Sequence, residues 1–139
     1  MLKIKRKKEK GEDGQAMVEF ALILPIFLLI LCGIIDFGWL FYNQLSLNNA
    51  CREGARYAVV HTAAGDNTKA IEEHIDNTTT TVFANDVRIE IIYSNPTDPV
   101  TGDVTVNLEA EINFLTPVLS TFMGREKTIY SSVIMKVES

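Results

Sequence analysis

The pattern of apolar and polar positions divides the chain into an N-terminal apolar run and a C-terminal part of shorter, two-faced elements. The segment from Phe20 to Ile35 carries no charge, and apart from Asp36 the apolar character continues to Phe41. As a helix, residues 20–40 would span about 32 Å, enough to cross a bilayer core of about 30 Å. The sequence therefore predicts one membrane-spanning helix, which we assign to residues 15–43.

Several residues inside this run have specific expected roles. Pro25 lacks a backbone donor and is expected to bend or loosen the helix. Trp39, Phe41 and Tyr42 form an aromatic group typical of a membrane–water interface. Asp36 lies about one helical turn inside that group, where a lipid-facing carboxylate is costly. Its side chain is expected either to extend outward to the interface or to pair with a partner subunit.

From Gln44 to Thr62 the pattern stays helical but becomes two-faced. Ala50, Gly54 and Ala58 fall at positions i, i+4 and i+8, so they share one face of the helix. Because these residues are small, another element can approach closely. We expect the inward face of a sheet to pack there, and the alternative is packing against another subunit.

The remainder predicts a second helix from residue 67 to about residue 82 and three strands. The strands cover residues 87–93, 104–114 and about 128–137, and each alternates apolar with polar side chains. One buried and one solvated face per strand is typical of an antiparallel sheet that covers a helix. The predicted fold class is α+β, with the long N-terminal helix packed on a small antiparallel sheet of about three strands.

A short helical turn is expected between the second and third strands. It begins at Thr116 and Pro117, and Gly124 follows its end. Four large apolar residues lie in six positions, which is more than a surface turn needs. They either complete the core or contact the membrane or a partner, and they are Val118, Leu119, Phe122 and Met123.

Charge is distributed unevenly along the chain. Residues 1–14 hold six basic and three acidic residues, giving +3, and the other seven basic and fifteen acidic residues give −8. A basic segment before a spanning helix is typical of the cytoplasmic side. We therefore expect a single-pass protein of the cytoplasmic membrane, with a leader (1–14) in the cytoplasm and an extracytoplasmic domain (44–139). A nucleic-acid-binding role for the basic segment is disfavoured because it adjoins the span.

The sequence shows no pattern typical of an enzyme. Cys32 and Cys51 would lie about 28 Å apart on a straight helix, too far for a disulfide. There is no glycine-rich phosphate loop, Cys/His ligand cluster or nucleophile motif, and Glu109 and Glu111 fall on the solvated face of a strand. We expect no catalytic residues, no cofactor and no metal site.

The N-terminal half carries a family resemblance. The segment GQAMVEFALILPIFLLILCGIIDFGWLFY, which starts at Gly14, and the later segment NNACREGARYAVV resemble the N-terminal signature of TadE-like proteins of the tight-adherence (Flp) pilus machinery. The resemblance implies a pilin-like fold and cleavage by a prepilin peptidase after Gly14. Gln15 would then be the new N-terminus and Glu19 the fifth mature residue. In a helical stack the freed ammonium of one subunit can meet Glu19 of its neighbour, and Asp36 is the second candidate for assembly contacts.

The expected function is that of a pseudopilin or minor pilin-type subunit for assembly of a tight-adherence, type IV-like pilus. Its expected partners are the prepilin peptidase, other pilins and pseudopilins, the pilus assembly machinery and the lipid bilayer. A cell-surface pilus is a further expected location. The alternative is a permanently membrane-anchored protein whose outer domain binds a partner or surface without entering a filament.

Overall fold

The computed structural model describes residues 12–61, 68–79, 87–95, 97–98 and 101–137. Its elements, in chain order, are α1 (Glu12–His61), α2 (Thr68–Thr79), β1 (Val87–Tyr93), β2 (Gly102–Asn113), α3 (Pro117–Met123) and β3 (Glu126–Val137). The N-terminal eleven residues of the predicted leader and the predicted end of the second helix lie outside the described residues.

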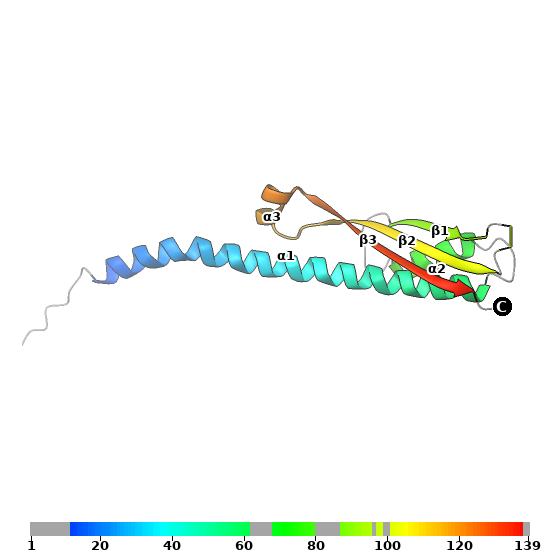
Figure 1. The fold of residues 1–139 in the computed structure, drawn as a ribbon. Helices are drawn as coiled ribbons and strands as arrows, with labels where there is room; N and C mark the ends of the chain where they lie inside the picture. Colours follow the sequence, from blue (N-terminus) through cyan, green and yellow to red (C-terminus); the bar gives the residue numbers. More distant parts are fainter. Residues whose placement is uncertain (1–11, 62–67, 80–86, 96, 99–100, 138–139) are drawn as a thin grey trace, which may run out of the picture.

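Helix α1 dominates the molecule. It has 50 residues and runs without interruption through Pro25 and through the predicted domain boundary at residue 43. At 1.5 Å per residue it is about 75 Å long. Its N-terminal half projects alone, and its C-terminal half carries the rest of the fold (Figure 1).

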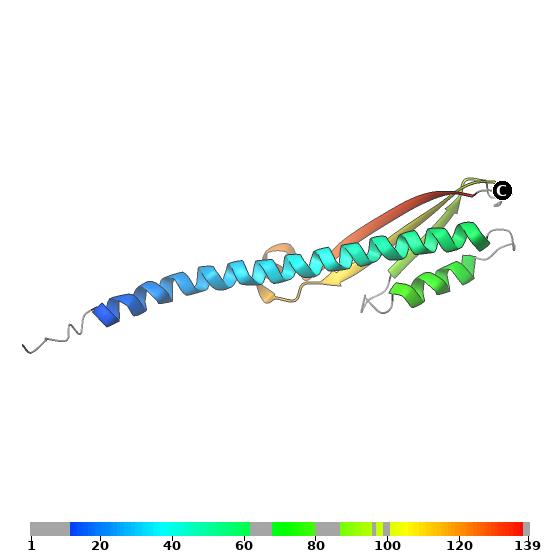
Figure 2. The same cartoon turned by 90° about the horizontal axis from the view of Figure 1, so that it is seen from below.

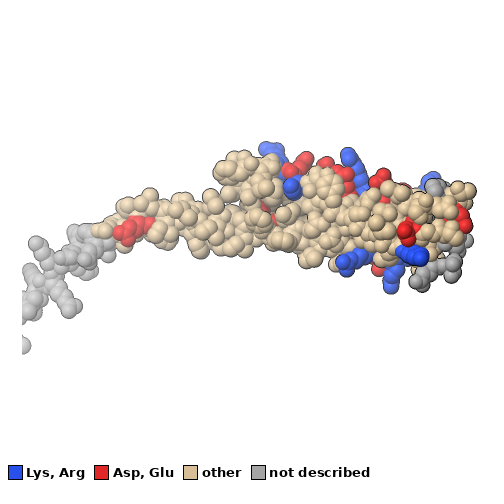
Figure 3. Space-filling model, in the orientation of Figure 1, with Lys and Arg blue, Asp and Glu red and all other residues tan. Residues whose placement is uncertain are grey.

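The projecting half of α1 has the surface of a membrane span. It is long and apolar enough to cross a bilayer, and no residue of its most apolar stretch is buried within the protein. A core helix of a soluble protein would be mostly covered by other elements. Apart from an acidic patch at its N-terminal end, Figure 3 shows this half without charged side chains, whereas charges are frequent over the C-terminal domain.

The three strands form one antiparallel sheet in the order β1-β2-β3. The central strand pairs Leu108 with Ile89 on one side and with Ser131 on the other. The predicted alternation is confirmed, because β2 buries one face against the helix and turns the other outward. The buried face consists of Val104, Val106, Leu108, Ala110 and Ile112.

The sheet lies along the C-terminal half of α1, and α2 runs beside the same part of α1 (Figure 2). From α1 the core receives Leu47, Ala50, Cys51, Ala55 and Ala58. Two buried isoleucines of α2, Ile71 and Ile75, complete that side. The predicted α+β fold with a long apolar N-terminal helix is therefore confirmed.

Strands β2 and β3 begin two residues earlier than predicted, because Gly102 pairs with Val137 and, at the other end of the ribbon, Glu126 pairs with Asn113. Gly102, the first residue of β2, has φ = 118°, a backbone conformation that residues with a Cβ rarely adopt. The result is a long β2–β3 ribbon that reaches back along α1 toward its bare half (Figure 1).

Candidate functional site

The predicted processing site lies on the bare end of α1. Gly14, Gln15 and Glu19 are all exposed, and an added Cβ at Gly14 would meet no atom within 4 Å. The Gln15 Nε2 donates a hydrogen bond of 3.1 Å to Glu19 Oε1. Residues 15 and 19 therefore share one helix face, and the peptide bond after Gly14 lies within a helical turn.

Asp36 is fully buried, although it belongs to the apolar half of α1. Its Oδ1 accepts hydrogen bonds of 3.0 Å from the backbone N–H groups of Leu115 and Thr116, and its Oδ2 accepts one from the Thr116 hydroxyl. Hydrogen bonds to a carboxylate are roughly twice as strong as neutral ones. Neither alternative from the sequence describes this side chain. The segment before α3 covers it, so it does not extend to the interface, and its hydrogen-bond donors belong to its own chain and not to another subunit.

Further polar contacts follow along the same side of α1. The Trp39 Nε1 donates to the carbonyl oxygen of Asn113 at 3.2 Å, and the Gln44 Nε2 donates to that of Tyr130 at 2.9 Å. We call these residues and their partners the membrane-proximal docking site. It comprises Asp36, Trp39 and Gln44 of α1 with Asn113, Leu115, Thr116 and Tyr130. It fixes the end of the β2–β3 ribbon to the helix.

One buried polar atom next to this site lacks a partner. The Asn43 Nδ2 donates to the Trp39 carbonyl oxygen at 2.7 Å, but the Asn43 Oδ1 has no hydrogen-bond partner among the described residues. Asn43 is almost completely buried. The polar character of this short stretch of α1 marks the change from the bare half of the helix to the half that carries the domain.

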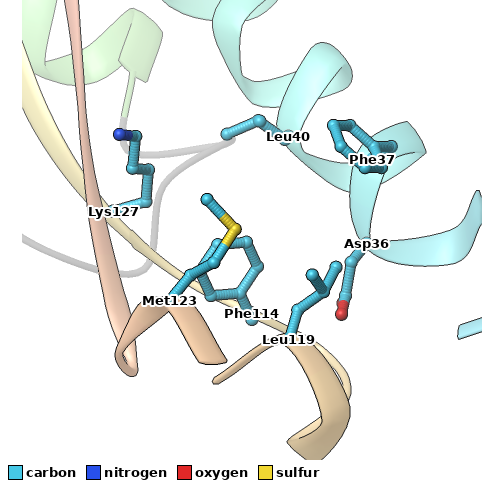
Figure 4. A pocket seen from close by; sticks show the side chains of 7 residues that line it. All are labelled: Asp36, Phe37, Leu40, Phe114, Leu119, Met123 and Lys127. Atoms are coloured by element: carbon cyan, nitrogen blue, oxygen red, sulfur yellow. The ribbon is translucent and has the colours of Figure 1, made fainter. Parts of the chain in front are cut away.

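A small apolar cavity of about 40 Å³ lies between α1 and α3 beside the docking site (Figure 4). Phe37 and Leu40 of α1 face Leu119 and Met123 of α3 across it. This volume could hold a water, but the exposed walls are apolar, and apolar cavities stay dry. The cavity is therefore a packing gap between two docked elements.

The small-residue face meets two different neighbours. Ala50 and Ala58 belong to the core, and the thiol of Cys51 donates to the Val106 carbonyl oxygen of β2 at 3.1 Å. At Gly54, however, an added Cβ would lie 2.5 Å from two side-chain carbons of Ile75 in α2. The close approach at Gly54 is thus made by a helix, whereas the sequence favoured the sheet.

Burial raises the pKa of the Cys51 thiol above its ordinary value of 9.0. The protonated form is therefore the one that persists at neutral pH, and it is the form that can donate to Val106. A buried, protonated thiol is chemically inert and behaves as a small apolar residue.

Helix α2 is held against α1 partly by stacked rings. Tyr57 stacks on His61 with ring centroids 3.9 Å apart and on His74 of α2 with centroids 4.3 Å apart. His74 is therefore a packed side chain in the contact between α1 and α2. Among the described residues, no group of three or more His, Cys, Asp or Glu side chains is arranged to hold a metal ion.

The contacts of Asp36 could not be read from the sequence, because its partners lie 79 and 80 positions away. Two local features of the sequence are nevertheless consistent with this contact. A carboxylate in an apolar run requires donors, and the Thr116-Pro117 pair supplies a hydroxyl and an N–H just before a short helix. The sequence alone did not connect these two features.

A bare apolar helix that continues into a small sheet-bearing domain defines an α+β protein with one helix that is long and apolar enough to anchor it in a membrane. The family model described as TadE-like protein matches residues 14–56, so the TadE-like resemblance is confirmed over this segment. The match relates the chain to the proteins of tight-adherence pilus assembly, a family that is not generally enzymatic. No match was found among curated proteins or among solved structures.

Proposed function

We propose that this protein is a pseudopilin of a tight-adherence pilus, cut by a prepilin peptidase between Gly14 and Gln15. The observation that carries the proposal is the family match, which begins at Gly14 itself and ends within α1. The segment before the cut is the basic leader, and the segment after it is the bare apolar helix that a pilin subunit needs both in the membrane and in a filament.

The geometry at the N-terminus suits this role. Gly14 and Gln15 are exposed, and none of the other elements that the structure describes covers them. Cleavage requires local unwinding of the first helical turn, which costs little at a helix end because the first four N–H groups have no intrahelical partner. Glycine at position 14 lowers the cost further because it has the weakest helix preference after proline.

Glu19 is the residue we assign to subunit contacts in the filament. Its carboxylate is exposed on the bare helix, where it accepts a hydrogen bond from the Gln15 amide. A carboxylate on an apolar helix is stabilised by a cation, and the new N-terminal ammonium of a neighbouring subunit is such a cation. Asp36 is already satisfied within its own chain, so we assign it to holding the domain on α1 and leave assembly to Glu19.

In this proposal residues 15–43 span the cytoplasmic membrane, with the leader in the cytoplasm and residues 44–139 outside. The mature subunit then passes to the pilus assembly machinery and to other pilins. A protein that stays permanently in the membrane and binds a partner through its outer domain would remain in the membrane fraction under all conditions, so cleavage followed by extraction from the membrane separates the two functions.

The decisive test is N-terminal sequencing of the protein made in cells that contain a prepilin peptidase. We expect the mature chain to begin at Gln15, and Gly14→Arg to leave the full-length precursor. Gly11→Arg is the matched control, because it adds the same charge three residues earlier and should not prevent cleavage. Wild-type protein that keeps its leader in such cells would contradict the proposal.

A further inference from the structure

Helix α3 and the residue before it carry a large exposed apolar surface. The side chains of Leu115, Phe122 and Met123 are 58%, 80% and 60% exposed, and no residue of α3 is buried. The apolar turn therefore does not complete the core, which was one of the alternatives left by the sequence. Exposed apolar side chains grouped in this way mark a surface that contacts a partner or a membrane.

The position of α3 indicates what covers this surface. The docking site holds the start of α3 against α1 at Asp36, within the apolar half of the helix. On the same stretch of α1, Ile34, Ile35 and Phe37 are more than half exposed. The apolar surface of α3 therefore lies beside that of the membrane span, and Figure 1 shows α3 at the tip of the ribbon nearest the bare helix.

The depth of α3 follows from helix geometry. Asp36 precedes Tyr42, the last residue of the interfacial aromatic group, by six residues, or about 9 Å along the helix axis. A bilayer that covers the apolar run of α1 places Asp36 below its surface on the side of the C-terminal domain. Because α3 is fixed to Asp36, α3 must enter the same layer.

The charges around the tip fit this depth. Residues 114–124 carry no charge, and the exposed residues Arg125 and Lys127 follow immediately, with Glu126 between them. The Lys127 chain also lines the cavity between α1 and α3 (Figure 4). Basic side chains next to an inserted apolar segment can reach lipid phosphates while their alkyl chains stay among apolar groups.

We propose that the tip of the β2–β3 ribbon, residues 114–124, inserts into the bilayer leaflet on the side of the C-terminal domain and forms a second membrane contact. Lipid covers Phe122 and Met123, and the docked tip shields the Asp36 carboxylate from that lipid. This inference depends on membrane anchoring alone and not on cleavage after Gly14.

The test uses the full-length chain in vesicles of phosphatidylethanolamine and phosphatidylglycerol. A nitroxide label is attached at Phe122→Cys, or in a second variant at Met123→Cys, in a Cys32→Ser and Cys51→Ser background. The control label is at Ile134→Cys on the outer face of β3. The Ile134 side chain is also apolar, and it is 67% exposed. Relaxation by oxygen, which concentrates in lipid, is compared with relaxation by a water-soluble nickel chelate.

We expect the labels at positions 122 and 123 to favour oxygen over the nickel chelate by several-fold relative to the label at 134. Equal nickel accessibility at 122, 123 and 134 would overturn the proposal. Dipolar broadening at 122 that disappears on dilution with unlabelled protein would overturn it too, because a second copy of the chain would then cover α3. All three sites are exposed, so the labels leave the core intact.

Discussion

The carboxylate of Asp36 accepts hydrogen bonds from both the backbone N–H and the side-chain hydroxyl of Thr116, 80 positions later in the chain. This pair joins the apolar half of α1 to the end of the folded domain that carries α3. A charged group that would be costly in a bare span is thereby stabilised by donors that the domain itself supplies.

Replacing Asp36 should therefore detach the tip of the ribbon from the helix. Asp36→Ala removes an acceptor of three hydrogen bonds, and each bond to a charged group contributes about 1.5–3 kcal/mol. Leu40 and Met123 line the same cavity, so Leu40→Cys and Met123→Cys in a chain without the native cysteines should be crosslinked by a short bis-maleimide. We expect most of this crosslinking to be lost when Asp36→Ala is added.

Asp36→Asn should retain part of this crosslinking, because its amide oxygen can still accept from the two N–H groups. Glu53→Ala is the control, since Glu53 forms an exposed ion pair with Arg56 on the same helix. Full crosslinking in Asp36→Ala would show that the docking site does not depend on the carboxylate.

Gly54→Leu should destabilise the domain by pushing α2 away from α1. An added Cβ already lies 2.5 Å from Ile75, and overpacking typically costs about 1–3 kcal/mol. For a domain of this size we expect the melting temperature of the full chain in detergent to fall by about 5–10 °C. Ile75→Ala in the same chain should restore part of the loss.

Gly33→Leu is the matched control for Gly54→Leu, because nothing lies within 4 Å of the Cβ added there. Its melting temperature should stay close to the wild-type value. If Gly54→Leu also melted normally and only assembly failed, the small-residue face would serve another subunit instead of α2.

Cys51 should be unreactive while the domain is folded. Its thiol is buried, donates to the Val106 carbonyl oxygen and has a raised pKa. In Cys32→Ser protein, maleimide should label Cys51 only after denaturation, and the folded state should lose stability as the pH rises above about 9, where the unfolded thiol ionises. Fast labelling of native protein at pH 7 would show that the core opens readily.

The proposed orientation predicts that the domain is reached from outside the cytoplasmic membrane. In a Cys32→Ser background, Thr101→Cys, an exposed position between β1 and β2, should react with an impermeant maleimide in spheroplasts. A cysteine in the leader, Lys8→Cys, should react only after lysis in cells that lack the prepilin peptidase. The reverse pattern of labelling would place the domain in the cytoplasm.

Local periodicity was sufficient to predict most of the fold. The spacing of Ala50 and Ala58 identified a buried face of α1, and the alternation around Leu108 identified the central strand. Periodicity could not say which element covers each position. Because α1 packs against both the sheet and α2, its buried face is wider than the predicted stripe and includes Ala55, and the neighbour of Gly54 is Ile75.

The docking site was beyond such reasoning. Asp36 and Trp39 each stood out in the sequence, one as a charge in an apolar run and the other as an interfacial aromatic. Apart from the Thr116 hydroxyl, their partners are backbone groups of Asn113, Leu115 and Thr116, and backbone groups leave no mark in the sequence. Only the three-dimensional path of the β2–β3 ribbon brings these groups to α1.

Helix α1 passes from its bare half into the folded domain without a break, so no flexible linker separates the two. The domain must therefore tilt and rotate together with the span as one rigid body. Over the roughly 27 Å of helix from Leu40 to Ala58, a change in tilt of about 10° would displace the far end of the domain by about 5 Å. A force applied to the domain is likewise transmitted directly to the helix, and the proposed pseudopilin role requires this mechanical coupling to draw the subunit out of the membrane.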